Sequence, residues 1–309
     1  MSTTSISVVL ATYNGANYLL AQLDSLLKQT LLPDEIIFSD DCSTDATELI
    51  ISEFIKLNKG KIDFKYYVNN GLSGVYYNFE NALIHVSGDI IFLCDQDDIW
   101  FEKKLEFHKK KYEELNCISV ISDALFVDES LKSLGLTKLE SIRSKAKKQN
   151  FVQGCCVSFK KSLLKIILPF PKINNLTHDE WIYYCTLAYG TRHVDNKVLQ
   201  YYRRHGRNDS LSLANGDQNI FNIKRFIKIL NYKHILKNYA IFTELEKRCS
   251  GIELNNDFVN KSDMAKSRFK FLMSRLFDFR QAGIYLKNKS YTILIVDIIR
   301  KLTYKCDIF

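Results

Sequence analysis

The sequence predicts an α/β fold in which a mostly parallel sheet is flanked by helices and followed by a basic, helical C-terminal extension. Short β-rich runs alternate with longer helical periods between residues 6 and 127, and this spacing is typical of βαβ units. Polar clusters follow the ends of the expected strands, which is where ligands bind in such sheets. The excess of positive charge is confined to the C-terminal part of the chain.

The individual elements follow from the period of the apolar residues. A Lys/Ser-rich stretch at 131–150 breaks the pattern and is expected to form a surface loop. Before it we expect strands at 6–11, 35–38, 62–68, 90–93 and 118–126, with helices at 16–29, 44–57, 75–86 and 101–115 between them. After it we expect a strand at 151–159, helices at 160–168 and 179–189, and an extended segment at 192–203.

Composition narrows the class of protein. A chain of 309 residues with 46% hydrophobic and 25% charged residues is ordinary for a globular protein. No run of 18 apolar residues is present, so no bilayer span is expected, and the N-terminus lacks the basic start of a secretory signal. Eight cysteines without a Cys-x-x-Cys pair indicate buried thiols in a reducing compartment. These features predict a cytoplasmic protein.

The most informative motif is the acidic stretch that follows the strand expected at 90–93. Asp95, Asp97 and Asp98 lie within four residues, and grouped carboxylates repel one another unless a cation neutralises them. Asp95 and Asp97 alternate with Gln96, so their side chains can converge on one hard divalent ion, Mn²⁺ or Mg²⁺. A solvated acidic turn is the alternative interpretation.

Several motifs in sequence order resemble family 2 glycosyltransferases over residues 5–210. They are SVVLATYNGANYLLAQLDSLLKQT, DEIIFSDDCSTDAT, GDIIFLCDQDDIW, Gly154-Cys155-Cys156, THDEWI and YRRHGRN. The resemblance is closest to the bacterial rhamnosyltransferase-like branch that builds surface polysaccharides such as O-antigen and capsule. It implies a GT-A fold that binds a nucleotide-sugar and transfers the sugar with inversion at the anomeric carbon.

The resemblance gives the acidic stretch a role. It implies that Asp95 and Asp97 form a DXD motif that holds the divalent cation, with His205 as a further candidate ligand. A cation there stabilises the negative charge that grows on a departing nucleoside diphosphate. Asp95 also approaches the donor ribose, while Asp98 and Trp100 are expected in the second shell or near the acceptor.

The donor is expected to lie against the ends of the first two strands. Thr12, Tyr13 and Asn14 end the first strand, and Asp40 and Asp41 end the second. Tyr13 is expected to pack against the base. In the family one of the paired aspartates binds the base, and the sequence leaves open which of Asp40 and Asp41 does so. An Asx-turn with a helix cap is the alternative for this pair.

Further cationic groups come from YRRHGRN. Arg203 and His205 match the family pattern and are expected to bind the donor diphosphate, because Arg forks pair with phosphate oxygens. A basic surface turn is the alternative, above all for Arg204 and Arg207.

The resemblance assigns the catalytic base to Asp179 in the segment THDEWI. This residue would take the proton from the attacking acceptor hydroxyl. His178, Glu180 and Trp181 surround it in sequence and are expected near the acceptor or in the second shell. An everyday helix cap is the alternative interpretation for Asp179.

The sequence divides into a catalytic domain at 1–215 and a basic, mainly helical region at 216–309. From residue 221 onward there are 18 Lys and Arg against 8 Asp and Glu, whereas the first 220 residues hold 25 against 27. Bases interleaved with apolar residues at helical spacing suit a helix on an anionic membrane surface. A helical cap on the catalytic domain is the alternative interpretation.

Together these features predict a metal-dependent, non-processive enzyme that is peripheral at the inner face of the plasma membrane. The Gln-x-x-Arg-Trp motif of processive members is missing, because the two tryptophans are Trp100 and Trp181. The expected donor is dTDP- or UDP-linked, and the expected acceptor is a polyprenyl-diphosphate-linked glycan. No nucleic-acid partner is expected. A UDP-hexose transferase of the same fold, a nucleotidyltransferase and a non-catalytic nucleotide-sugar-binding module are the competing interpretations.

Overall fold

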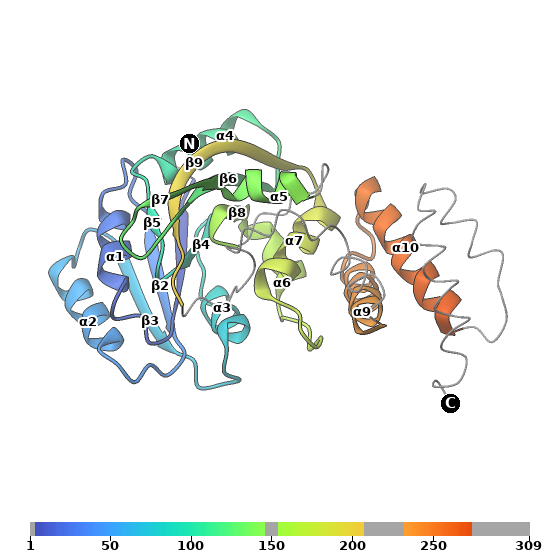
Figure 1. Cartoon of the computed structure of the whole chain (residues 1–309), viewed down its shortest axis with the longest axis horizontal. Helices are drawn as coiled ribbons and strands as arrows, with labels where there is room; N and C mark the ends of the chain where they lie inside the picture. Colours follow the sequence, from blue (N-terminus) through green and yellow to red (C-terminus); the bar gives the residue numbers. More distant parts are fainter. Residues whose placement is uncertain (1–3, 146–153, 207–231, 274–309) are drawn as a thin grey trace. The chain divides into compact units, whose positions relative to one another are not determined.

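The computed structural model describes residues 4–145, 154–206 and 232–273. Contacts within the chain define two compact units. The first unit comprises residues up to 170 together with 177–209, and the second comprises residues 171–176 together with those from 210 onward. All the strands of the described ranges lie in the first unit, whereas helices α9 (Tyr232–Arg248) and α10 (Asn256–Met273) lie in the second (Figure 1).

A nine-stranded sheet organises the first unit, in the order β3-β2-β1-β4-β8-β6-β9-β5, with β7 paired to β6. Strand β1 pairs in parallel with β2 and β4, and β2 pairs in parallel with β3, as expected. Strand β6 is also parallel to β9. The pairs of β8 with β4 and β6, of β7 with β6 and of β5 with β9 are antiparallel. The strands are β1 (Ile6–Thr12), β2 (Glu35–Asp40), β3 (Asp63–Val68), β4 (Ile90–Asp95), β5 (Ile99–Trp100), β6 (Ser119–Val127), β7 (Ser133–Thr137), β8 (Val157–Lys160) and β9 (Arg192–Arg203). The predicted α/β fold class is confirmed.

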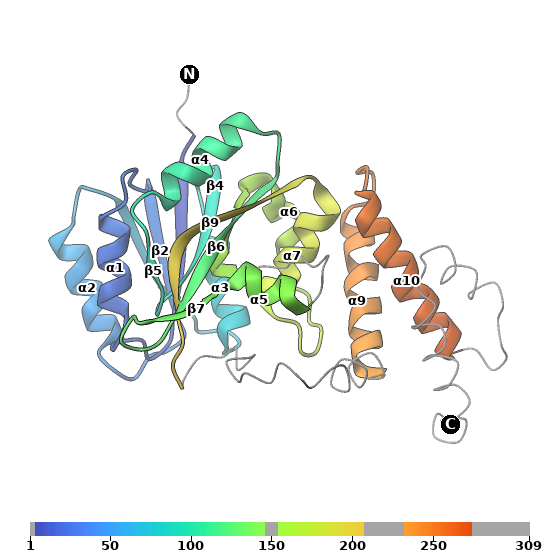
Figure 2. The ribbon, with the colours of Figure 1, turned by 45° about the horizontal axis from the view of Figure 1, so that its top comes forward.

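Helices cover both faces of the sheet. Helices α1 (Leu19–Leu27) and α2 (Thr47–Leu57) lie on one side of β1 to β4, and α3 (Val75–Leu83) lies on the other (Figures 1 and 2). The strands between them are buried on both faces, which explains why β1, β2 and β4 read as continuous apolar runs rather than alternating ones. The remaining helices are α4 (Lys104–Glu114), α5 (Lys138–Lys145), α6 (Leu164–Ile167), α7 (His178–Tyr189) and the short 3₁₀ turns η1 (Gly154–Cys156) and η2 (Lys161–Leu163).

The prediction of a surface loop at 131–150 is wrong for residues 133–145. Strand β7 and helix α5 occupy most of it, and residues 146–150 lie outside the described ranges. Helix α5 forms because its first residues, Lys138 and Leu139, are buried and the backbone N–H of Leu139 donates to Asp123 Oδ1 at 2.9 Å. The helix expected from residue 44 begins at Thr47 instead, since Ser43 and Thr44 bond to the preceding loops.

Other expectations beyond residue 150 hold more closely. Helix α7 and strand β9 match the predicted helix and extended segment to within one residue. The strand expected at 151–159 shrinks to β8, because η1 occupies 154–156, and residues 151–153 lie outside the described ranges. The predicted basic helices appear as α9 and α10, while 207–231 and 274–309 lie outside the described ranges.

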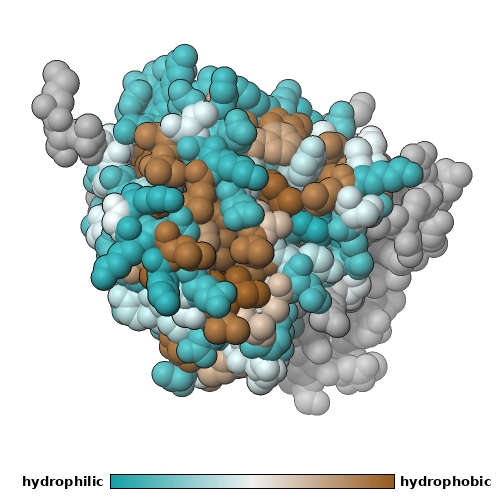
Figure 3. Space-filling view, turned by 90° about the vertical axis from the view of Figure 1, so that its left-hand side faces the viewer, coloured by the Kyte–Doolittle hydropathy of each residue, from teal (hydrophilic) through white to brown (hydrophobic). Residues whose placement is uncertain are grey.

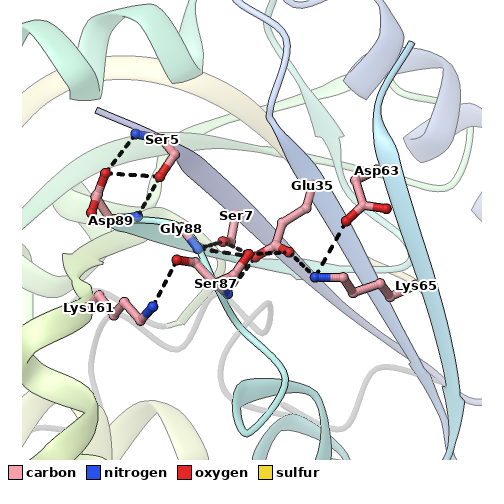
Figure 4. Close-up of polar contacts among 9 residues, drawn as sticks. All are labelled: Ser5, Ser7, Glu35, Asp63, Lys65, Ser87, Gly88, Asp89 and Lys161. Atoms are coloured by element: carbon pink, nitrogen blue, oxygen red, sulfur yellow. Dashed lines mark hydrogen bonds and ion pairs between the residues drawn. The ribbon is translucent and has the colours of Figure 1, made fainter. Parts of the chain in front are cut away.

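A saturated polar network holds the edge at which β1, β2 and β4 begin (Figure 4). The carboxylate of Glu35 is buried, yet it accepts hydrogen bonds from Ser7 Oγ (2.5 Å), Lys65 Nζ (2.5 Å) and both the backbone N–H and Oγ of Ser87 (2.7 Å each). Burial alone would raise the pKa of Glu35, but the hydrogen bonds from Lys65, Ser7 and Ser87 outweigh it and lower the pKa to about 2. We therefore expect the hydrogen bonds of Glu35 to stabilise the fold.

Helices α1 and α2 present apolar side chains on the face shown in Figure 3. Leu20, Leu49 and Leu57 are the large hydrophobic side chains that these two helices expose. Exposed leucines are common on protein surfaces. None of the helices within the described ranges combines the length and the hydropathy that a bilayer span requires.

Candidate active site

The candidate site lies at the opposite edge of the sheet, where β1, β2 and β4 end. In the strand register, Thr12 lies beside Asp40 and Ala11 lies beside Asp95. Parallel strands bring their carboxyl ends to one edge, so three polar clusters that are far apart in sequence become neighbours. This convergence is what the sequence predicted.

The paired aspartates at the end of β2 already accept hydrogen bonds from other residues of the protein. Asp40 accepts hydrogen bonds from Thr12 Oγ1 (2.7 Å) and from the backbone N–H (2.7 Å) and Oγ (2.6 Å) of Ser43. Asp41 accepts from Asn69 Nδ2 (2.7 Å), Ser73 Oγ (2.9 Å) and the backbone N–H of Gly74 (2.8 Å). Both carboxylates are buried. A carboxylate offers about four acceptor positions, so each keeps about one for a donor, and which of them binds the base stays a prediction.

The loop after β1 presents one aromatic side chain. Tyr13 is 56% exposed, so its ring is available to pack against a base. Asn14 adopts the left-handed region (φ +46°), and its Oδ1 accepts from the backbone N–H of Thr44 at 2.8 Å. Asn14 therefore joins this loop to the one after β2, and its predicted contact with the donor would be additional to that role.

Asp95 lies in an environment that repels its negative charge. Burial raises the pKa of Asp95, the negative charges of Asp97 and Asp179 raise it further, and the positive charges of His178 and Lys138 oppose them. Among the described residues no donor is bonded to the Asp95 carboxylate. Asp97, from the same motif, and Asp179, from a distant one, thus both lie within electrostatic reach of Asp95.

His205 approaches this cluster from the end of β9. Its Nε2 lies 2.7 Å from Asp97 Oδ2, and its ring stacks on Tyr18 with centroids 4.5 Å apart. Arg203, by contrast, is buried and donates from Nε to the carbonyl of Asp97 (2.9 Å) and from Nη1 to that of Glu129 (3.0 Å). Arg203 therefore braces the acidic loop, and its predicted contact with the diphosphate would use other atoms. Arg207 lies outside the described residues.

A further buried carboxylate, that of Asp98, lies close to Asp95. Asp98 is fully buried, accepts a hydrogen bond from Gln200 Nε2 at 2.7 Å, and has ligand atoms within 4.8 Å of those of Asp95 and Cys155. Burial raises the pKa of Asp98 well above its usual range. Asp98 thus lies close to Asp95, and the second-shell or acceptor role expected for it stays a prediction.

Two buried lysines accompany this group, and sequence reasoning missed both. Lys138 Nζ lies 3.7 Å from Cys155 Sγ, and Lys104 Nζ donates to the carbonyl of Cys155 at 2.7 Å. Their positive charges offset the buried carboxylates. Lys104 left a weak signal, since it falls on the buried side of a helix otherwise rich in charge, whereas Lys138 lies in the stretch taken for a loop.

Asp179 lies in the first turn of α7. Thr177 is the N-cap, and its Oγ1 accepts from the backbone N–H of Glu180. Asp179 Oδ1 accepts from Thr177 Oγ1 (2.5 Å) and from the backbone N–H of Glu180 (2.9 Å). Both contacts use Oδ1, so Oδ2 is the oxygen left to receive a proton. The cap interpretation thus applies to Thr177 rather than to Asp179.

Gly154 and His178 shape the surroundings of Asp179. A Cβ at Gly154 would lie 3.0 Å from His178 Nε2 and 3.4 Å from Asp179 Cβ, so a larger residue there would press on His178. The His178 ring stacks on Phe79 with centroids 4.2 Å apart. His178 is therefore held beside the proposed base, and its role near the acceptor or in the second shell stays a prediction.

The two tryptophans do not reach the site surface. Trp181 is buried and donates from Nε1 to the carbonyl of Ile167 at 2.8 Å. Trp100 is buried in the core beneath Lys104 Nζ, which lies 3.8 Å from the ring centroid. Neither ring is exposed enough to touch an acceptor, which leaves the second-shell alternative for both, and that role stays a prediction.

The chemistry of the residues at this edge suits a divalent cation. Asp95 and Asp97 could supply carboxylate oxygens, which hard divalent ions prefer, and His205 a nitrogen that Mn²⁺ tolerates. The residues whose ligand atoms lie within 4.8 Å of one another here are Asp95, Asp98 and Cys155. An ion would also remove the repulsion that raises the pKa of Asp95.

Comparison with known proteins defines the class. Residues 7–168, more than half of the chain, match the family described as glycosyl transferase family 2. The chain therefore belongs to glycosyltransferase family 2. An uncharacterized glycosyltransferase of Nostoc sp. is 25% identical over 82% of this chain and 74% of its own length. One of Rickettsia typhi is 28% identical over 65% of this chain and 64% of its own length.

Solved structures share the fold. The Staphylococcus aureus protein TarS (residues 1–349), in complex with UDP-GlcNAc, superposes with a TM-score of 0.58 at 18% identity, covering 96% of this chain and 89% of that one. The mannosyltransferase PcManGT from Pyrobaculum calidifontis, in complex with GDP-Man and Mn²⁺, gives 0.54 at 16% identity, covering 99% and 89%. At this identity the likeness shows a common fold.

Proposed function

We propose that this chain is a divalent-cation-dependent, inverting glycosyltransferase. It adds a single sugar from a nucleoside diphosphate donor to a lipid-linked glycan during the synthesis of a surface polysaccharide. The observation that carries the proposal is the gathering of Asp95, Asp97 and Asp179 at one edge of the sheet, with the Asp95 carboxylate lacking a donor within the described residues. Such a group is costly without a positive ligand.

The cation would be held by Asp95 and Asp97, with His205 at 2.7 Å from Asp97 as a further ligand. When bound, it supplies positive charge to the departing diphosphate. The Mn²⁺ named with PcManGT supports this assignment, since that protein shares the fold.

The protein's own residues supply the proton transfer and the orientation of the donor. Asp179 accepts the proton of the acceptor hydroxyl on Oδ2, because Oδ1 is held by Thr177 and Glu180. Tyr13 packs on the base, and one of Asp40 and Asp41 accepts a hydrogen bond from it through its remaining lone pair. Direct attack of the acceptor on the donor, without a covalent intermediate, inverts the anomeric centre.

The donor is UDP- or dTDP-linked. TarS with UDP-GlcNAc supports a UDP-sugar, while the motifs that resemble the rhamnosyltransferase branch support dTDP-rhamnose. Residues 1–215 form the catalytic domain in this proposal. The basic region at 216–309 holds the enzyme at an anionic membrane surface, where a polyprenyl-linked acceptor is found.

A panel of nucleotide-sugars tests the proposal. UDP-GlcNAc, UDP-glucose, dTDP-rhamnose and GDP-mannose are each incubated with the protein in Mn²⁺ and in EDTA, with hydrolysis and thermal shift as readouts. The proposal predicts that one UDP- or dTDP-linked donor is selected and that EDTA abolishes its turnover. A chain that responds to none of them, or equally to all with and without Mn²⁺, would not be this enzyme.

Membrane attachment has its own test. Co-sedimentation with vesicles of anionic phospholipid is compared with vesicles of phosphatidylcholine, at low and high salt. If about five bases reach the surface, each contributes about 1 kcal/mol, and high salt releases the protein. Retention at high salt would point to hydrophobic docking instead.

A further inference from the structure

The side chain between the two cation-binding aspartates is bonded to the backbone of another loop. Gln96 Oε1 accepts from the backbone N–H of Tyr13 at 2.9 Å, and Gln96 Nε2 donates to the carbonyl of Tyr13 at 2.9 Å. One amide thus satisfies both main-chain groups of one residue. The register of β1 with β4 ends at Ala11 and Asp95, so the Gln96 amide continues the pairing of these strands beyond its last backbone step.

Gly15 leaves the room that this contact requires. A Cβ built on Gly15 would lie 2.1 Å from Gln96 Oε1 and 2.5 Å from Gln96 Cδ, which is closer than any real Cβ contact. The structure gives the glycine at position 15 a specific reason, namely that the Gln96 amide occupies the place of its missing side chain.

The same loop is fixed from its other side. The backbone N–H of Asn14 donates to Ser43 Oγ at 2.9 Å, and that of Gly15 donates to Thr47 Oγ1 at 2.8 Å. The loop after β1 is therefore held between the start of α2 and Gln96. These attachments hold the backbone of Tyr13 and of the two residues after it, while the Tyr13 side chain is exposed.

We propose that Gln96 is a positioning residue that couples the cation site to the nucleoside site. This inference rests on the proposed function. Gln96 is covalently linked to both Asp95 and Asp97, so a cation that draws these carboxylates together also fixes the amide. The amide in turn fixes the Tyr13 backbone and hence the direction of its ring. Cation and base thereby bind cooperatively through Gln96, in addition to any contact between the ion and the phosphates.

Such a coupling is reciprocal, so it is measurable as the factor by which Mn²⁺ tightens nucleotide binding. The probes are UDP and dTDP, titrated by calorimetry into the full-length protein in Mn²⁺ and in EDTA. Contact between the ion and the phosphates contributes to this factor in every variant. The difference between the wild type and a Gln96 variant therefore isolates the contribution of the loop.

Gln96→Met keeps the length of the side chain and removes both hydrogen-bonding groups. We expect it to reduce the Mn²⁺ factor about fivefold or more, the usual lower end of such couplings. Gly15→Ala should reduce it similarly by displacing the amide, and the double variant should lose no more than either single one, because both break the same contact. Asn116→Ala, which removes an exposed amide in the loop before β6, is the matched control and should keep the wild-type factor.

The outcomes separate the two proposals. A Gln96→Met protein that melts near the wild-type temperature and loses affinity equally with and without Mn²⁺ would make Gln96 a structural brace and overturn the coupling. A wild-type factor in Gln96→Met would overturn it too, while leaving the glycosyltransferase proposal intact. If the wild-type protein binds neither UDP nor dTDP in Mn²⁺, the proposed function fails, and the coupling fails with it.

Discussion

The two edges of one sheet treat their carboxylates in opposite ways. Where the strands begin, Glu35 is surrounded by donors from Ser7, Lys65 and Ser87, which lower its pKa to about 2. Where the strands end, Asp95 has no bonded donor among the described residues, and burial with the charges of Asp97 and Asp179 raises its pKa. Burial acts on both groups, and the hydrogen-bonding partners decide the direction.

This difference separates stability from function. A saturated carboxylate stabilises the fold, whereas a repelled one is tolerated where a ligand supplies the missing positive charge. The contrast implies that substitutions at the two edges have opposite signatures. Changes at the first edge should reduce stability and spare activity, and changes at the second should abolish activity and spare or raise stability.

The largest effect is expected at Asp179. Asp179→Asn keeps the acceptor oxygen that Thr177 and Glu180 bond to, but it cannot take a proton. We expect the rate of transfer to fall by about 10²–10⁴-fold, the usual contribution of a general base, with donor affinity unchanged. Steady-state kinetics and calorimetry measure the two quantities. Asp24→Asn, an exposed carboxylate on α1, is the control, and turnover that persists in Asp179→Asn would place the base elsewhere.

At the stable edge, Glu35→Gln should lower the free energy of unfolding by about 3 kcal/mol at pH 7, because a shift of this size from 4.5 to about 2 corresponds to that energy. Urea unfolding measures it. Asp63→Asn is the control, since Asp63 is exposed and lies 3.4 Å from Lys65, and it should cost less than about 1 kcal/mol. A loss of activity per folded molecule in Glu35→Gln would contradict the expectation that changes at this edge spare activity.

The same group predicts a dependence on pH. The pKa of Glu35 is lowered in the folded state, so its contribution is fully present above pH 4.5 and disappears as the pH falls toward 2. The stability of the wild type and of Glu35→Gln should therefore converge on acidification from pH 6 to pH 3. Parallel curves over this range would mean that Glu35 is not the group that titrates.

The smallest effect, and the most unusual in sign, is expected at Asp95. Asp95→Asn removes a buried charge that Asp97 and Asp179 repel, so in EDTA it should raise the stability by about 1 kcal/mol. It should also cancel the stabilisation that Mn²⁺ gives the wild type. Differential scanning fluorimetry in EDTA and in Mn²⁺ measures both. A variant that is less stable than the wild type in EDTA would show that the carboxylate is held rather than repelled.

The sequence predicted the parts of the site that depend on local pattern. The ends of the strands could be predicted from the apolar runs. The βαβ pattern alone therefore predicted that Thr12, Asp40 and Asp95 lie close together. The start of α7 was readable in the same way. The resemblance to a family then supplied roles for Asp179 and His205 that no spacing could have given.

Contacts between distant segments were out of reach. Lys138 and α5 were taken for a loop, because a short helix rich in Lys and Ser has no apolar period of its own and forms only through tertiary contacts such as that with Asp123. The bond of Gln96 to Tyr13 spans 83 residues, and nothing in either segment indicates it. The burial of Trp100 and Trp181 was out of reach for a related reason, since sequence alone cannot tell a buried aromatic ring from an exposed one beside polar residues.

The electron paramagnetic resonance signal of aqueous Mn²⁺ tests the central claim most directly. When Mn²⁺ is titrated into the protein with UDP or dTDP, the free-ion signal should be suppressed up to one equivalent, and Asp95→Asn should restore it. A free-ion signal that is the same with wild-type protein as with buffer and nucleotide alone would contradict the account, because Asp95 and Asp97 would then hold no cation.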